Sequence, residues 1–133
     1  ASFEHSPEKE MGVFPITLTK AGLNDPYLKK LIHGLPVGHW HNDMPGLTAE
    51  SQVLAVSEGC PRQIIRYTER VYGFQCHLEL TPALVDLLIA HDEAQWPMPG
   101  MYTYVQTPEA IRSYDYTAMN EALWAFLDGF VGC

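Results

Sequence analysis

Short β-type runs follow one another closely through the first 75 residues of this chain, and most of the helix start signals come only after them. Each run is rich in β-branched or aromatic residues and is bounded by proline, glycine or charged turn residues. The expected strands cover residues 12–19, 37–41, 52–57, 63–68 and 71–75. The first contains a proline, which suits a sheet edge or a strand end. Several strands followed by helices indicate an α/β fold.

Helix start signals occur at four places. In three of them a capping side chain stands next to or near a proline that suits the first helical turn, and the fourth opens a broad apolar face. The starts are Asn24-Asp25-Pro26, with a short helix expected through Lys30, then Thr81-Pro82, Thr107-Pro108 and Thr117. The proline- and glycine-rich stretch 96–100 predicts a loop between the second and third of these helices.

Length and composition narrow the class of protein. With 133 residues and 47% hydrophobic content, the chain is long enough for a single domain, residues 1–133, with a proper core. A net charge of −8 opposes binding to nucleic acid or to an anionic membrane surface. No apolar run approaches the roughly 20 residues that span a bilayer. An odd number of cysteines, three, without metal-like spacing fits a reducing compartment, so we expect a cytoplasmic protein.

A histidine and a glutamate two residues apart lie at the end of an apolar run, just after the last predicted strand. Residues i and i+2 of a strand point to the same face, so Glu79 can lie beside the His77 imidazole and hold one tautomer. This arrangement is the base half of a nucleophile, base and acid triad. A His-x-Glu pair alone is weak evidence, because most such pairs are surface residues or a packed histidine.

The residues around this pair make it specific. Gly73 to Glu79 resembles the GFQ-x-H-x-E signature of class I glutamine amidotransferases, and further segments similar to that family occur in the family's order. These segments are Pro7 to Pro15, His39 to Asp43 and Ser57 to Pro61, so the resemblance covers roughly residues 1–92. Leu78 departs from the family, which most often has proline there. Residues 93–133 would add a C-terminal loop and helices.

The resemblance implies the C-terminal part of a flavodoxin-like domain, an open sheet flanked by helices, with the nucleophilic cysteine on a segment before Ala1. It implies that His77 takes the thiol proton and later protonates the leaving ammonia, while Glu79 orients it. It also implies that His39, Trp40 and His41 help to hold the substrate glutamine. The reaction would convert glutamine to glutamate and ammonia without a cofactor, and a synthetase or another ammonia-using partner would consume the ammonia.

The cysteines of this chain do not fit the nucleophile. Cys76 is adjacent to His77 and should face the opposite side of the sheet. Cys60 lies in a predicted turn and Cys133 ends the chain, and neither has the Gly-x-Cys-x-Gly context of a nucleophile elbow. We therefore expect that the chain alone does not hydrolyse glutamine.

Two alternatives from other classes remain. His39, His41 and Asp43 share a strand face and could begin the site of a metal-dependent hydrolase, although Met44 departs from that pattern, and the two histidines could equally be packed near a sheet edge. The other alternative is a non-enzymatic interaction module. Loss of the N-terminal strands would expose a sheet edge and apolar surface, which predicts a homo-oligomer.

Overall fold

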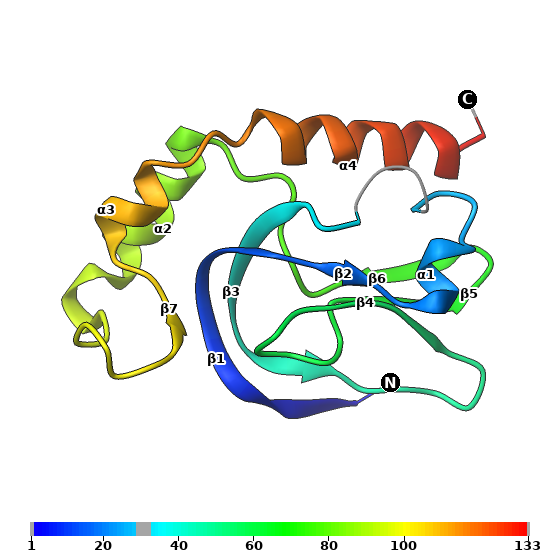
Figure 1. The fold of residues 1–133 in the computed structure, drawn as a ribbon, viewed down its shortest axis with the longest axis horizontal. Helices are drawn as coiled ribbons and strands as arrows, with labels where there is room; N and C mark the ends of the chain where they lie inside the picture. The colour runs from blue at the N-terminus through cyan, green and yellow to red at the C-terminus, as the bar shows by residue number, and fades with distance from the viewer. Residues whose placement is uncertain (1, 29–32, 133) are drawn as a thin grey trace.

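Strands and helices follow one another in nearly the predicted order in the computed structural model, which describes residues 2–28 and 33–132 (Figure 1). The strands are β1 Phe3–Pro15, β2 Thr17–Leu18, β3 Pro36–Pro45, β4 Gln52–Val56, β5 Ile64–Thr68, β6 Val71–Phe74 and β7 Tyr104–Val105. The helices are α1 Lys20–Leu23, α2 Pro82–Asp92, α3 Pro108–Arg112 and α4 Thr117–Phe130, with a 3-10 turn η1 at Glu93–Gln95. The predicted α/β class is confirmed.

Within the described residues the strands form two sheets. One has the order β3-β1-β7 and the other the order β2-β4-β5-β6. Every pairing is antiparallel except that of β1 with β7, where Glu10 and Met11 lie opposite Tyr104 and Val105. The pairing of β1 with β3 shifts register between His5 and Glu10, so that Glu10 lies opposite His41.

The strand predicted over 12–19 differs from what the structure shows. It begins at Phe3, ends at Pro15 and is followed by the separate short strand β2. It is the middle strand of its sheet rather than an edge strand. Pro15 is tolerated because it is the last residue of β1, where the missing N–H breaks no continuing ladder.

The helix predicted from Asn24 to Lys30 does not form as expected. The helix α1 comes earlier, with Thr19 as N-cap, and residues 26–28 form a turn. The Asp25 carboxylate accepts hydrogen bonds from the backbone N–H groups of Tyr27 and Leu28, which holds the turn, and it also accepts the Tyr72 hydroxyl at 2.6 Å. Lys30 lies outside the described residues.

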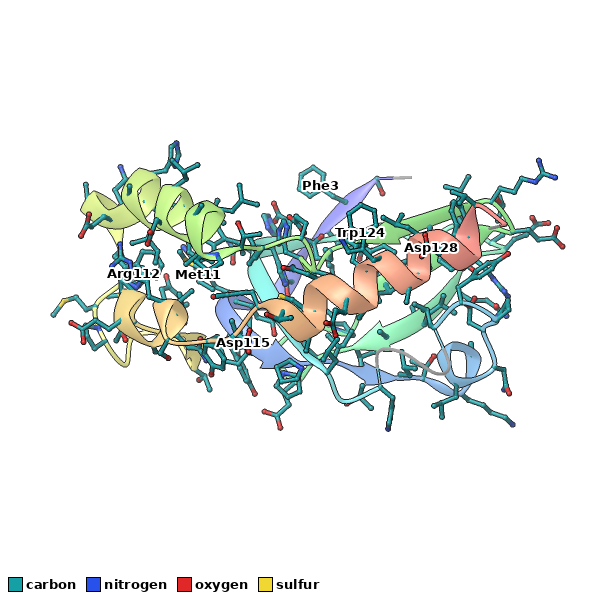
Figure 2. The ribbon with its side chains drawn as sticks, turned by 90° about the horizontal axis from the view of Figure 1, so that it is seen from above. Phe3, Met11, Arg112, Asp115, Trp124 and Asp128 are labelled. Atoms are coloured by element: carbon teal, nitrogen blue, oxygen red, sulfur yellow. The ribbon has the colours of Figure 1, made fainter. Side chains whose placement is uncertain are left out.

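The helix α4 runs along the second sheet (Figure 1). It buries Met119, Ala122 and Phe126, and the Phe126 ring lies 5.1 Å from that of Phe74 in β6. Its apolar face is narrower than its sequence predicts, since Trp124, labelled in Figure 2, is 68% exposed. No helix in the described part of the chain is long and apolar enough to cross a membrane.

The helices α2 and α3 lie beside one another, at the end of the molecule away from the C-terminus of α4 (Figure 1). Arg112 of α3 donates from Nε to the Asp86 carboxylate of α2 at 3.0 Å. The two helices lie side by side in Figure 2. The predicted starts at Thr81 and Thr107 are confirmed, because each threonine hydroxyl accepts an N–H of the first turn. The helix α2 therefore begins directly after the His77 segment.

Candidate active site

The predicted His-Glu pair is formed in the structure. His77 Nδ1 lies 2.7 Å from Glu79 Oε1. The two residues do not belong to a regular strand, since β6 ends at Phe74. Instead His77 forms an isolated antiparallel bridge with Gly38 of β3, in which each N–H donates to the other carbonyl, at 2.7 and 2.9 Å.

A close approach of backbones fixes this bridge. A side chain at position 38 would overlap the end of the Leu80 side chain and crowd the His77 carbonyl, so glycine lets the His77 segment lie close against β3. Leu78 and Leu80 are buried, and the alternation of the extended segment turns His77 and Glu79 outward. Asn120 of α4 donates to the carbonyls of both leucines, at 2.8 and 2.9 Å.

The hydrogen bond between His77 and Glu79 sets the chemistry that the histidine can perform. With Nδ1–H donating to the carboxylate, neutral His77 keeps its Nε2 lone pair available as a base. The carboxylate also stabilises the imidazolium that forms when Nε2 takes a proton. His77 is 36% exposed and Glu79 is 51% exposed, so a reacting group can reach the ring.

An apolar hollow of about 270 Å³ lies beside the pair. It is lined by Trp40, His77, Glu79, Leu80, Leu84 and Leu88. The two leucines at 84 and 88 come from α2, one turn apart, and the hollow therefore joins the His77 segment, β3 and α2. A small substrate could lie next to the imidazole here while most of its apolar surface is removed from water.

Trp40 also lines a second hollow of about 250 Å³, together with His41, Asp92 and Lys9. Its indole Nε1 donates to Asp92 at 2.7 Å, and its ring meets that of Trp96 edge to face at 5.4 Å. These contacts hold the indole plane in place. Hydrogen bonds from Trp40 and His91 lower the pKa of Asp92 below its ordinary value.

The three predicted substrate-binding residues have different surroundings. Trp40 is the one that lines the hollow beside His77, whereas His41 lines only the second hollow and its side chain is almost fully buried. His39 is completely buried, and its ring faces the interior. Strand alternation turns the His39 and His41 side chains away from Trp40 and into the protein. That this segment helps to hold a substrate through its backbone and the Trp40 side chain stays a prediction.

The buried histidines belong to a polar cluster around Glu10. His41 Nε2 lies 2.8 Å from Glu10 Oε1, and His39 Nδ1 lies 3.6 Å from the same oxygen. Gln63 donates to Oε1 at 2.7 Å, and the Ser57 hydroxyl donates to Oε2 at 2.7 Å. Both Glu10 oxygens thus accept hydrogen bonds, which compensates the burial of the carboxylate.

The hydrogen bonds of the cluster shift the pKa of Glu10. His41 Nδ1 donates to the Asp43 carbonyl at 3.0 Å, and its Nε2 faces the Glu10 carboxylate at 2.8 Å. Burial alone would raise the pKa of Glu10, but hydrogen bonds from His41 and Ser57 lower it below its ordinary value. Burial lowers the pKa of His39 to about 4, so this ring is neutral near pH 7.

The predicted metal ligands do not converge. The Asp43 carboxylate is exposed and pairs with His5 at 2.8 Å, while His39 and His41 point into the interior. A different set does come together, since ligand atoms of Glu10, His41 and Cys60 lie within 4.8 Å of one another.

The side chains of this second set, Glu10, His41 and Cys60, already form hydrogen bonds with other groups of the protein. Both Glu10 oxygens accept hydrogen bonds, and the Cys60 thiol donates to the Arg62 carbonyl at 3.6 Å. A metal ion would have to displace these partners. The donor set therefore fits a closed polar network better than a metal centre.

The described cysteines are both buried. Burial raises the pKa of the Cys60 and Cys76 thiols, so neither is readily ionised. The Cys76 sulfur points toward the Gln63 carbonyl, at 3.9 Å, and not toward the outward-facing His77. Cys133 lies outside the described residues.

Three residues that hold the segments around His77 in place were not predicted from the sequence: Glu10, Gln63 and Asn120. The sequence carries one signal for Glu10, a charged residue directly before the apolar run Met11 to Phe14 within a segment that resembles the family. Gln63 is completely buried and Asn120 is half-buried. Their partners lie 53 and about 40 residues away, at separations that no local pattern reveals.

Comparison with known proteins identifies two relatives that are each 51% identical to this chain. The chain is 51% identical over 123 residues to the protein named glutamine amidotransferase-like protein YfeJ of Salmonella typhimurium, a match that covers 92% of this chain and 52% of that protein. The crystal structure of SMU.1228c is also 51% identical, with a TM-score of 0.92, over 98% of this chain and 56% of that one. No protein-family model matches the chain.

More distant solved structures share the fold. A glutamine amidotransferase of Thermotoga maritima has a TM-score of 0.81 at 16% identity, covering 99% of this chain and 55% of that one. Glutamine amido transferase from Methylobacillus flagellatus has a TM-score of 0.77 at 20% identity, covering 94% and 52%. The chain spans about half the length of the relatives that it matches.

Proposed function

We propose that this chain, a portion of a glutamine amidotransferase-like protein, supplies the general base and its orienting carboxylate for the hydrolysis of glutamine. The observation that supports this most directly is the 2.7 Å contact between His77 Nδ1 and Glu79, at a partly exposed position beside an apolar hollow. In the proposed reaction His77 Nε2 takes the proton of a cysteine thiol that another part of the protein supplies.

The thiolate then attacks the side-chain amide carbon of glutamine. The imidazolium of His77 returns its proton to the leaving amide nitrogen, which departs as ammonia, and a glutamyl thioester remains. Water, deprotonated by His77, hydrolyses the thioester to glutamate and regenerates the thiol. Glu79 stabilises each imidazolium and holds Nε2 toward the reacting atoms.

Trp40 and the two leucines of α2 have a different part in this proposal. They exclude water from one side of the imidazole and contact the aliphatic part of the substrate. The ammonia would serve an acceptor-using partner such as a synthetase. Without a cysteine in reach of His77, the chain alone is inactive in this account.

Glutamate release tests the proposal. The 133-residue chain and a version joined to the nucleophile-bearing part of the domain are each assayed with and without His77→Ala. His5→Ala is the matched control, because His5 forms a histidine–carboxylate contact of 2.8 Å on the exposed surface. Activity in the joined protein that is lost with His77→Ala but not with His5→Ala supports the proposal. Activity that survives His77→Ala in the joined protein contradicts it.

Exposed apolar side chains favour a second candidate, a module that associates with other chains. Leu87 of α2 and Trp124 of α4 are each 68% exposed, and Phe3 of β1 is equally exposed. In this alternative the 133-residue chain forms a homo-oligomer. Sedimentation that shows a stable monomer at micromolar concentration, without binding of a hydrophobic dye, would rule it out.

A further inference from the structure

Two separate supports hold the His77 backbone, and both lead back to one buried carboxylate. The first support is β3, through the bridge to Gly38. The second is the residue that precedes β5, Gln63, which binds the segment just before His77. We propose that Glu10 is a positioning residue for His77, which fixes the imidazole by tying these two supports together. The catalytic consequence rests on the proposed function, but the structural claim does not.

The first support runs from Glu10 through β3. His41 binds the Glu10 carboxylate at 2.8 Å, and the neighbouring His39 lies 3.6 Å from it while donating from Nε2 to the Phe14 carbonyl at 3.0 Å. Gly38, adjacent to His39, exchanges both backbone hydrogen bonds with His77. The position of this part of β3 relative to β1 therefore sets where His77 lies.

The second support runs through Gln63. Its side-chain amide donates to Glu10 at 2.7 Å, and its backbone carbonyl accepts the N–H of Gln75 at 2.8 Å. The Cys76 thiol faces the same carbonyl at 3.9 Å. Gln63 thus holds the two residues immediately before His77, on the side of the segment that the bridge to Gly38 does not reach.

Burial makes the polar cluster around Glu10 sensitive to any change in the Glu10 carboxylate, which is its hydrogen-bond acceptor. Glu10, His39 and Gln63 are completely buried, so a donor that loses the carboxylate finds no water to replace it. Among the residues that the structure describes, the His39 Nδ1 and Gln63 Oε1 atoms already have no hydrogen-bond partner. Without the Glu10 oxygens, His41 Nε2 would lose its 2.8 Å contact and the Gln63 amide would keep only the Ser57 hydroxyl, at 2.9 Å, so both supports would shift.

Glu10 acts through these neighbours and not on a reacting atom. Among the described residues it forms no hydrogen bond with His77 or Glu79, and it lines neither hollow beside Trp40. The expected effect is therefore on the orientation of the imidazole rather than on contacts with a substrate. Misplacing a catalytic group by about 1 Å is enough to slow a reaction about a hundredfold.

The experiment compares Glu10→Met with Ser57→Ala. Ser57→Ala also removes a 2.7 Å hydrogen bond to the Glu10 carboxylate, and it removes the 2.9 Å hydrogen bond that Ser57 accepts from Gln63, but it leaves the contacts of Glu10 with His41 and Gln63 in place. Hydrogen exchange of the Gly38 and His77 amides is measured by NMR in the 133-residue chain, together with the tautomer of the His77 ring. We expect Glu10→Met to speed exchange at both amides at least about tenfold more than Ser57→Ala and to reduce the Nδ1–H tautomer. Glu10→Gln, which keeps an acceptor oxygen, should restore most of the protection.

Gln63→Met provides the test if Glu10→Met does not fold. It removes the donor to Glu10 and leaves the backbone carbonyl that binds Gln75, so exchange at His77 should still rise above that in Ser57→Ala. Equal exchange in Gln63→Met and Ser57→Ala, or in Glu10→Met and Ser57→Ala, overturns the positioning role.

Glutamate release in the joined protein separates the two proposals. If Glu10 positions His77, Glu10→Met lowers kcat about tenfold to a hundredfold with little change in KM, and Ser57→Ala does not. If exchange at His77 rises as expected but the unmodified joined protein releases no glutamate, the proposed function fails and the positioning role stands.

Discussion

Acidification should destabilise this protein through His39 well before its carboxylates are protonated. The His39 ring is completely buried, and its Nε2 donates to the Phe14 carbonyl. Burial lowers its pKa from an ordinary 6.5 to about 4, so the folded protein keeps it neutral while the unfolded chain takes up a proton. Between these two values the unfolded state binds more protons. Stability is therefore full above pH 6.5 and is lost as the pH falls toward 4.

The size of the effect follows from the two pKa values. Their difference of about 2.5, at about 1.4 kcal/mol per pKa unit, gives a total of about 3 kcal/mol. Near pH 5, roughly 2 kcal/mol of this is already lost. Glu10 does not interfere in this window. Its pKa is lowered in the folded state, so the stability that it contributes is lost only as the pH falls below its ordinary value of 4.5.

Urea unfolding at pH 7 and pH 5 measures this loss. The unmodified chain should lose about 2 kcal/mol of unfolding free energy between the two pH values. The His39→Gln variant keeps a donor for the Phe14 carbonyl but does not titrate, so its loss should be smaller by about that amount. His5→Gln, at an exposed position, should behave like the unmodified chain. Equal losses in His39→Gln and the unmodified chain would refute the reasoning.

Three further predictions concern the support of the His77 segment. Gly38→Ala places a methyl group against the Leu80 side chain and should lower the free energy of unfolding in urea by about 1–3 kcal/mol. Hydrogen exchange at the bridge between Gly38 and His77 should become faster, and an unchanged unfolding midpoint would contradict the prediction. Asn120→Ala leaves the carbonyls of Leu78 and Leu80 without their donor and should cost about 1–3 kcal/mol by the same assay. Cys76 is buried with a raised thiol pKa, so a thiol reagent should modify it only as fast as the protein unfolds, and rapid labelling in native buffer would show an accessible sulfur.

Local patterns were sufficient for much of the architecture. Alternation and turn residues predicted β3, β4, β5 and β6 to within one to four residues, and the threonine caps predicted where α2 and α3 begin. The spacing of His77 and Glu79 predicted that their side chains would meet. These features depend on neighbours in sequence, which is why the sequence alone reveals them.

Long-range contacts explain what the sequence did not reveal. Asp25 was predicted to open a helix, but its carboxylate binds the distant Tyr72 and holds a turn. His39 and His41 face the interior, where the pairing of β1 with β3 places Glu10 opposite His41. Alternation along β3 predicts that these histidines share a face but does not indicate that this face is the buried one.

The account depends most on His77 as the general base, and one measurement tests this directly. Glutamate release by the chain joined to its nucleophile-bearing part is compared with that of the His77→Gln variant, which keeps a similar side-chain volume. We predict that kcat falls at least about a thousandfold in the variant, because no other described side chain pairs with Glu79 to take the thiol proton. A kcat within about tenfold of the unmodified protein would contradict the assignment of His77.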